Sequence, residues 1–389
     1  MRANTATKLG DETGWGKRHG IWSDRLSGFA RLCEERAAEA DEASHLSPAV
    51  TTALREAGIL VAPLPPDHAG QGLLQSSQWL LLHEALRAFG AADLSIGRLF
   101  EGHCNAIELV RRYGTSRQFE DLAAGIRRGA MTGVWGADGN KPLCIKRHEG
   151  RWQLEGGKIL ASGSGFLLKP LVTASSEEGQ RIVLLDLEGE DARIDLSRWT
   201  PQGMRSSATG SVDLSGIVIG DDNLIGEPGD FMRQPYFSGG AWRFCAVHLG
   251  AIERLVDLFI AQLRARRRDE DPYQLQRVAT CITAARSTAY WTKAAARHLA
   301  LSSHDAESCV ALSNLTRGVT ERAALDVMEV IQRGIGLASF MRPGPIERIS
   351  RDLRTYLRQP VPDLAMADAA RFALAAEVPV RDMWTADAN

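Results

Sequence analysis

The stretch RWQLEGGKILASG, residues 151–163, contains two short runs rich in β-formers on either side of a glycine pair. This pattern is typical of two strands separated by a turn. Similar short runs, separated by glycine and charged turns at intervals of about 8–12 residues, occupy residues 129–226. We therefore predict a central β-barrel domain over residues 129–226.

The segments on both sides of this region have the 3.6-residue period of amphipathic helices instead. Residues 23–128 predict an N-terminal all-α domain, and residues 227–389 contain long helical patterns that predict a C-terminal four-helix bundle. Residues 1–22 are polar and predict a flexible arm. The expected fold class is α+β, mainly α.

The composition is that of an ordinary globular protein. The chain has 389 residues, a net charge of −2 and 44% hydrophobic residues, which argues against a disordered chain and against broad binding to nucleic acid or anionic membranes. The six cysteines are scattered without a C-x-x-C pair, so we expect no metal site and a reducing, cytoplasmic location. No apolar run has the roughly 18–20 residues of a membrane-spanning helix.

Four motifs occur along the chain in an order that resembles the acyl-CoA dehydrogenase superfamily of FAD flavoproteins. They are EAGILVAPLPPDHAGQG (56–72), RRYGTSRQFEDLAAGIRRGAM (111–131), TPQGMRSSATGSVDLSGIVI (200–219) and VIQRGIGLASFMRPGPIERISRDLR (330–354). The last contains the P-x-E-R-x-x-R-D pattern of the family. The resemblance extends from about Leu46 to Ala376.

The resemblance implies FAD as the cofactor. In the family, a hydroxyl at the position of Ser162 hydrogen-bonds flavin N5, the atom that takes the hydride. An arginine of the cluster at residues 264–268 is expected to reach the pyrophosphate across a subunit interface, because a guanidinium binds phosphate oxygens bidentately. The flavin contacts implied are Thr132, Gly133, Ser162, Gly163, Arg266, Gly334 and Gly336. The substrate contacts implied are Arg205, Ser206 and Arg243.

The sequence departs from the family at the catalytic base. A dehydrogenase of this type needs a carboxylate to remove the α-proton of its acyl thioester. Of the two positions at which members carry that glutamate, one falls near Pro360 and the other near Gly240 or Ala241. The remaining candidates for a base are Glu101, His103, His248 and Asp363.

Three functions follow from this pattern. The first is an FAD-dependent dehydrogenase acting on an acyl-CoA or related activated acyl substrate, with hydride transfer to flavin N5. The second is a two-component monooxygenase of the same fold, in which reduced flavin and O2 oxygenate the substrate without an α-proton base. The third is a non-catalytic flavin or acyl-ligand binding protein. The resemblance also implies a homodimer or homotetramer, and an electron acceptor or flavin reductase as partner.

Overall fold

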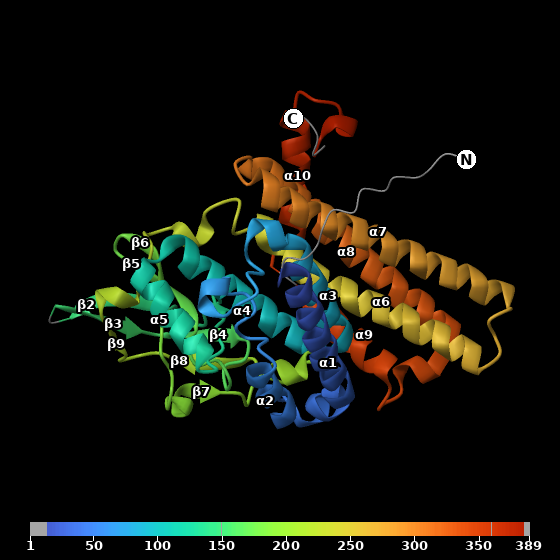
Figure 1. Cartoon of the computed structure of the whole chain (residues 1–389), viewed down its shortest axis with the longest axis horizontal. Helices are drawn as coiled ribbons and strands as arrows, with labels where there is room; N and C mark the ends of the chain where they lie inside the picture. Colours follow the sequence, from blue (N-terminus) through green and yellow to red (C-terminus); the bar gives the residue numbers. More distant parts are fainter. Residues whose placement is uncertain (1–13, 149, 359, 385–389) are drawn as a thin grey trace.

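The computed structural model describes residues 14–148, 150–358 and 360–384. It has a helical N-terminal region, a β-rich region in the middle of the sequence whose strands lie together at one end of the molecule, and a bundle of long C-terminal helices (Figure 1). The helices are α1 (Gly14–Ala43), α2 (Pro48–Glu56), α3 (Trp79–Ala92), α4 (Leu94–Tyr113), α5 (Ser116–Arg127), α6 (Trp242–Ala265), α7 (Pro272–Ser302), α8 (Ala306–Ile335), α9 (Pro345–Tyr356) and α10 (Pro362–Ala375). The predicted mainly α fold class with a central β unit is confirmed.

The central strands form two sheets. The first has the order β10-β6-β5-β2-β3-β9, with β1 beside β5, and the second has the order β4-β8-β7. The strands are β1 (Val134–Trp135), β2 (Cys144–His148), β3 (Arg151–Glu155), β4 (Gly157–Ala161), β5 (Leu171–Ser176), β6 (Gly179–Leu184), β7 (Ile194–Asp195), β8 (Gly210–Asp213), β9 (Val218–Ile219) and β10 (Leu224–Ile225).

The stretch 151–163 crosses from one sheet to the other. Its first half is β3 in the larger sheet, and its second half is β4 in the smaller sheet. Gly156 makes the turn between them with φ +98, and a Cβ there would lie 2.5 Å from the carbonyl oxygen of Pro142. Only glycine accepts both the positive φ and this close approach.

The helix α3 of the N-terminal region packs against α6, the first long helix of the bundle. Two glycines let their backbones meet. A Cβ on Gly90 of α3 would lie 1.9 Å from the carbonyl oxygen of Val247, and a Cβ on Gly250 of α6 would lie 1.9 Å from that of Arg87. The contact holds the N-terminal region firmly against the bundle, and α4 lies beside it.

Two boundaries differ from the sequence prediction. The helix α1 begins at Gly14, so residues 14–22 of the predicted arm are helical, while residues 1–13 lie outside the described part of the chain. The pattern predicted as the last bundle helix is two helices, α9 and α10, because Pro362 starts a new helix after the turn that follows Tyr356.

Candidate active site

Helix α4 organises the candidate site. Its N-cap is Asp93, whose carboxylate accepts hydrogen bonds from the backbone N–H groups of Ser95 (2.7 Å) and Ile96 (3.2 Å). Such an N-cap satisfies two otherwise unpaired donors of the first turn. The helix contacts β1 and β10 of the β unit and also α6 of the bundle. Because residues four apart share a helix face, its side chains divide between a β-facing side and a bundle-facing side.

On the β-facing side, His103 is fully buried and uses both of its ring nitrogens. Its Nδ1 accepts the N–H of Thr132 (3.2 Å), which leaves the proton on Nε2 to be donated to the carbonyl oxygen of Leu60 (2.8 Å). Burial lowers the pKa of His103 to about 4, so the ring is neutral near pH 7. His103 therefore positions Thr132 and has no free nitrogen with which to take a proton.

The four residues expected beside the flavin ring lie together next to this histidine. Thr132 is buried, and its hydroxyl donates to the carbonyl oxygen of Lys169. A Cβ on Gly133 would lie 2.6 Å from Leu167, and a Cβ on Gly163 would lie 2.8 Å from Leu99 of α4 and 3.2 Å from Leu167. Both glycines thus allow strand ends from different parts of the β unit to close on Leu167.

Ser162 is the member of this group with a free donor. Its carbonyl oxygen accepts the indole N–H of Trp135 (3.0 Å), and the next residue, Gly163, donates its N–H to the carbonyl oxygen of Ser207 (2.8 Å). The Ser162 side chain is half-buried, and among the described residues its hydroxyl has no hydrogen-bond partner. A fixed backbone with an uncommitted hydroxyl fits the donor that a flavin ring needs.

The other expected flavin contacts lie elsewhere. Arg266 is exposed at the end of α6, and Gly334 is buried against Phe259, with its carbonyl oxygen accepting from Gln274 (3.2 Å) at the start of α7. Gly336 follows with φ +77. This corner of the bundle is at the opposite end of the molecule from the strands (Figure 1). Within one chain these three residues do not meet Ser162, and their expected role across a subunit interface stays a prediction.

Arg205 and Ser206 lie near α1 and α9. The Arg205 guanidinium donates to the Ser44 hydroxyl (3.0 Å) and the Glu42 carbonyl oxygen (3.3 Å), and Ser206 is buried in the adjacent turn. The same turn is held to α9 because the backbone N–H of Met204 donates to the Asp352 carboxyl (2.6 Å). Arg205 lines two cavities that do not include Arg243.

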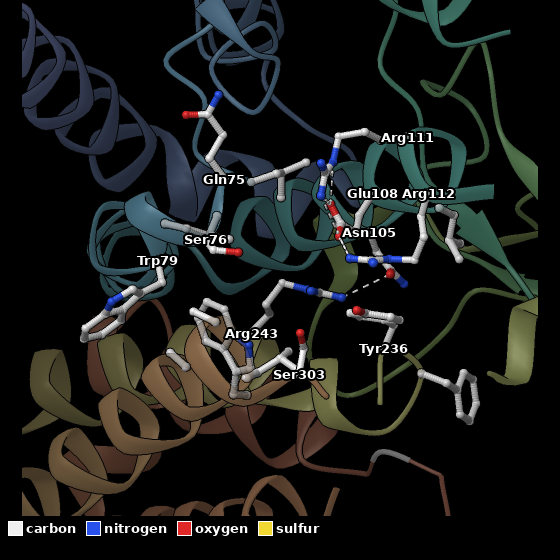
Figure 2. Close-up of a pocket in the computed structure, with 18 of the residues that line it drawn as sticks. Gln75, Ser76, Trp79, Asn105, Glu108, Arg111, Arg112, Tyr236, Arg243 and Ser303 are labelled. Carbon is white, nitrogen blue, oxygen red and sulfur yellow. Dashed lines mark hydrogen bonds and ion pairs between the residues drawn. The ribbon is translucent and has the colours of Figure 1, made fainter. Parts of the chain in front are cut away.

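Arg243 lines a cavity of about 380 Å³ between α4, the start of α6 and the end of α7 (Figure 2). It is 8% exposed, and its guanidinium donates to Asn105 (3.1 Å) on the bundle-facing side of α4. Its Nε lies 3.7 Å from the carboxylate of Glu101, which also pairs with Arg98 (3.0 Å). Glu101 is therefore an ion-pair partner of two arginines, and it is held beside the cavity.

His248 and Asp363 line a second, small cavity of about 70 Å³ on the other side of the α6 start. The ring of His248 packs at right angles to Tyr356, with 4.5 Å between centroids. Burial lowers the pKa of His248 to about 3, and its Nε2 has no hydrogen-bond partner among the described residues. Asp363 is exposed at the rim.

The sequence analysis did not single out Arg112, Tyr113 and Trp242, which also line the larger cavity. A signal was present in ELVRRYG, residues 108–114, because Arg112 is four residues from Glu108 and seven from Asn105. That spacing places these side chains on one face of α4. Trp242 had no comparable signal, since its position depends on how α6 begins.

Comparisons with known proteins agree with this architecture. Residues 24–130 match the family model of the acyl-CoA dehydrogenase N-terminal domain. The solved structure of butyryl-CoA dehydrogenase from Megasphaera elsdenii superposes with a TM-score of 0.76 at 16% identity, covering 96% of this chain and all of that one. The chain has the acyl-CoA dehydrogenase fold. The predicted resemblance to this superfamily of flavin-dependent oxidoreductases is confirmed.

Monooxygenases are also among the similar proteins. Dibenzothiophene monooxygenase from Rhodococcus erythropolis is 24% identical over 392 residues, which cover 91% of this chain and 93% of the relative. FMN-bound TdsC from Paenibacillus sp. A11-2 superposes with a TM-score of 0.82 at 18% identity, covering 94% of this chain and all of that one; another TdsC structure contains FMN and indole. None of the helices in the described residues has the length and apolar character needed to cross a membrane.

Proposed function

We propose that this protein is a two-component flavin-dependent monooxygenase, which was the alternative to the dehydrogenase prediction. One observation carries the proposal. Where members of the superfamily place the α-proton base, this chain has Gly240 and Ala241 in a short 3-10 helix and Pro360 after α9. The similarity to dibenzothiophene monooxygenase over nine tenths of the chain supports the same choice.

The other candidates for a base do not replace the missing glutamate. Glu101 is paired with two arginines, and both ring nitrogens of His103 are occupied by backbone groups. His248 is neutral because of its burial. Oxygenation does not require abstraction of an α-proton, so these residues suit positioning and cavity shape better than general-base catalysis.

The residues around Leu167 are the proposed seat of the flavin ring. When bound in its reduced form, the flavin supplies two electrons to O2, so that one oxygen atom enters the substrate and the other leaves as water. We assign the free hydroxyl of Ser162 to hydrogen-bond the ring, while Thr132, Gly133 and Gly163 shape the backbone along its edge. His103 holds Thr132 in place through the bond from Thr132 N–H to Nδ1.

The decisive experiment compares the two oxidoreductase activities. The full chain is supplied with FMN, a flavin reductase, NADH and O2, with indole and dibenzothiophene as probe substrates, and incorporation of isotope-labelled oxygen is measured by mass spectrometry. We expect labelled product only when the reductase is present. Bleaching of bound flavin by an acyl-CoA thioester under anaerobic conditions, without labelled product in the first assay, would instead establish a dehydrogenase.

We further propose FMN rather than the expected FAD as the working flavin. TdsC carries FMN in its solved structure, and FMN lacks both the pyrophosphate for which Arg266 was expected and the adenosine for which Gly334 and Gly336 were expected. Titration of the chain with each flavin tests this choice, with Arg266→Gln as a matched variant. We expect FMN to bind at least as tightly as FAD, with no loss in the variant; FAD binding that is tighter and depends on Arg266 would restore the first expectation.

A further inference from the structure

The small cavity of about 70 Å³ that contains His248 lies where α6, α8 and the start of α10 meet. Its wall from α6 is formed by Phe244 and His248, which are four residues apart, and its wall from α8 includes Arg317 and Gly318. Gly318 lets α10 approach, since a Cβ there would lie 2.5 Å from the sulfur of Met366. One water needs about 10–15 Å³ of such a volume, so the cavity has room for a few waters or for one small ion.

Arg317 lines this cavity without a carboxylate partner. Glu321 is one turn further along α8, at the usual spacing for an ion pair with Arg317, but Arg358 after α9 pairs with Glu321 instead. Among the described residues Arg317 forms no ion pair. Its guanidinium donates to the carbonyl oxygen of Pro360 (2.7 Å) and lies 5.7 Å from the centre of the Phe244 ring. Burial lowers the pKa of Arg317, as it does for a cation that is partly removed from water.

His248 supplies a second polar group to the cavity. The residue is 2% exposed and packs against Tyr356, and its Nε2 makes no hydrogen bond within the described residues. The ring is neutral near pH 7 because burial lowers its pKa, so it carries one proton, which an acceptor in the cavity would draw to Nε2. Buried polar atoms are rarely left without a partner. Together, His248 and Arg317 indicate a ligand that accepts hydrogen bonds and carries a negative charge.

Two carboxylates also line the cavity, and neither cancels this preference. Glu321 is already paired with Arg358, and Asp363 is exposed at the rim, where solvent screens its charge. The other side chains of the wall are apolar: Phe244, Leu357, Pro362 and Met366. Because the dielectric constant is low beside such a wall, the guanidinium gains more from a counter-ion there than it would in water.

We propose that this cavity binds a small anion, a carboxylate or another oxyanion with about three or four non-hydrogen atoms, between the Arg317 guanidinium and the His248 imidazole. Arg317 uses one N–H group on Pro360, so its other N–H groups remain for the anion, and the imidazole supplies one more donor. Two sources share this chemistry: a free small anion and the acidic head group of a larger molecule. The inference is independent of the proposed oxygenase activity, because it rests only on the contacts of this cavity.

Acetate and acetamide are a matched pair of probes for this site, since they share size and shape but differ in charge. Binding to the full chain is measured at pH 7 and constant ionic strength from the shift of the denaturant-unfolding midpoint, because a ligand that binds only the folded chain stabilises it. We expect acetate to bind at least about tenfold more tightly than acetamide, as charge-assisted hydrogen bonds would produce. Equal binding of the two probes would overturn the inference and would leave the oxygenase assay unaffected.

Variants identify the residues responsible. Arg317→Gln should reduce the acetate preference to about threefold or less, and a preference that survives this substitution would contradict the inference. His248→Phe keeps a ring against Tyr356 but removes the donor, and it should weaken acetate binding by about three- to tenfold. Arg286→Gln is the matched control, because Arg286 also lies over an aromatic ring, 5.3 Å from the centre of Tyr290, but does not line the cavity. We expect it to retain the parent preference.

Asp363→Asn gives a test that partial unfolding cannot imitate, because it predicts tighter binding. The substitution removes the carboxylate at the rim and its repulsion of an anion, so acetate should bind about two- to threefold more tightly, while acetamide should bind as it does to the parent chain. This variant decides the question if Arg317→Gln does not fold. Acetate binding that is unchanged or weaker in Asp363→Asn would count against an anion in this cavity.

Nitrate and benzoate separate the two sources of the anion. If the ligand is a free small ion, nitrate and acetate should bind at least as tightly as benzoate, because the cavity has no room for a ring. If the ligand is the head group of a larger molecule, benzoate should bind more tightly than acetate. In both cases Arg317→Gln should weaken binding of the tighter ligand. If it weakens binding of none of the three anions, the inference is wrong.

Discussion

The β-facing and bundle-facing sides of α4 use their polar groups in opposite ways. On the β-facing side, His103 is buried with both nitrogens bonded to backbone groups of Leu60 and Thr132. On the bundle-facing side, Arg112 and Arg243 are held in place by Glu108 and Asn105, yet each keeps a buried Nε without a hydrogen-bond partner among the described residues. His103 therefore has no free ring nitrogen, whereas the two arginines each have an Nε that makes no hydrogen bond within the described residues.

The difference indicates which buried polar groups stabilise the fold and which are available to bind a ligand. A satisfied buried network contributes to stability and to a single well-defined geometry. Buried donors that lack partners destabilise the fold until a ligand pairs with them, so they persist where binding needs them. Substitutions on the two sides should therefore differ in what they disturb, and the following predictions are ordered by the size of the expected effect.

The largest effect is expected from His103→Leu. The substitution leaves the Leu60 carbonyl oxygen and the Thr132 N–H buried without partners, and each unpaired group costs about 1–3 kcal/mol. We expect the free energy of unfolding to fall by about 3–5 kcal/mol, with weaker flavin binding because Thr132 is released. Denaturant unfolding measures the first effect and flavin titration the second.

The control for this variant is His304→Leu, at an exposed position outside the site. It should change the free energy of unfolding by less than about 0.5 kcal/mol. If His103→Leu is as stable as the parent chain and only turnover is lost, His103 acts in catalysis and the β-facing side is not merely structural.

Asp352 extends the comparison to the N-terminal end of α4. Burial, together with the nearby charge of Asp93, raises the pKa of Asp352 to about 7. Between pH 4 and 7 the folded chain keeps a proton that the unfolded chain has lost, so this group makes the fold less stable as the pH rises. In the parent chain, this group should lower the free energy of unfolding by about 2–4 kcal/mol between pH 4 and 7. In Asp352→Asn that decrease should be absent.

The asparagine still offers an oxygen to the backbone N–H of Met204, so the hydrogen bond to the turn before β8 can persist. Denaturant unfolding of both chains at several pH values gives the slope of the free energy of unfolding against pH. The histidines contribute equally to both slopes, so their contributions cancel in the difference. A slope that is the same in both chains would show that Asp352 is ionised in the fold throughout this range.

The ion pairs of Glu101 offer a sharper test, because the two partners are not equivalent. Glu101→Gln leaves both Arg98 and Arg243 without their carboxylate, whereas Arg243→Gln leaves Glu101 paired with Arg98 at 3.0 Å. We expect losses of about 2–3 kcal/mol for Glu101→Gln and about 1–2 kcal/mol for Arg243→Gln. The double variant should lose less than the sum, since the two residues interact.

The exposed pair of Arg36 and Glu39 supplies the comparison, because Glu39→Gln should cost less than about 0.5 kcal/mol. All four variants are measured by denaturant unfolding. If Glu101→Gln keeps full stability but abolishes turnover, Glu101 is a catalytic base, and the dehydrogenase interpretation regains support.

Much of the fold follows from the sequence, and so does the grouping of four of the seven expected flavin contacts, for identifiable reasons. The change from a 3.6-residue period to short alternating runs marks the central β unit. The family resemblance implied that Thr132 and Ser162 lie together, although 30 residues of chain separate them. Local sequence patterns are enough to predict a feature when a single helix or strand contains the whole pattern.

The hydrogen-bond partners of individual side chains could not be predicted from the sequence, because they belong to distant segments of the chain. His103 was a reasonable candidate for a base from the sequence. In the structure its Nε2 donates to the carbonyl oxygen of Leu60, in the loop after α2. Arg205 was expected near the substrate, which stays a prediction; its hydrogen bonds to the Ser44 hydroxyl and the Glu42 carbonyl oxygen, close to the end of α1, had no signal in the sequence. Burial and partners of this kind are decided by tertiary packing, which periodicity does not encode.

The smallest effect is expected at Tyr236, where the bundle-facing cavity meets the Arg112 guanidinium. Tyr236→Leu removes a cation–π contact with 3.2 Å between the guanidinium carbon and the ring centre, and such contacts contribute about 0.5–1 kcal/mol at partly exposed sites. Tyr236→Phe keeps the ring and should be within about 0.2 kcal/mol of the parent chain. Denaturant unfolding separates the two variants. Equal losses in both would assign the contribution to the tyrosine hydroxyl, and Arg112 would then be held by Glu108 alone.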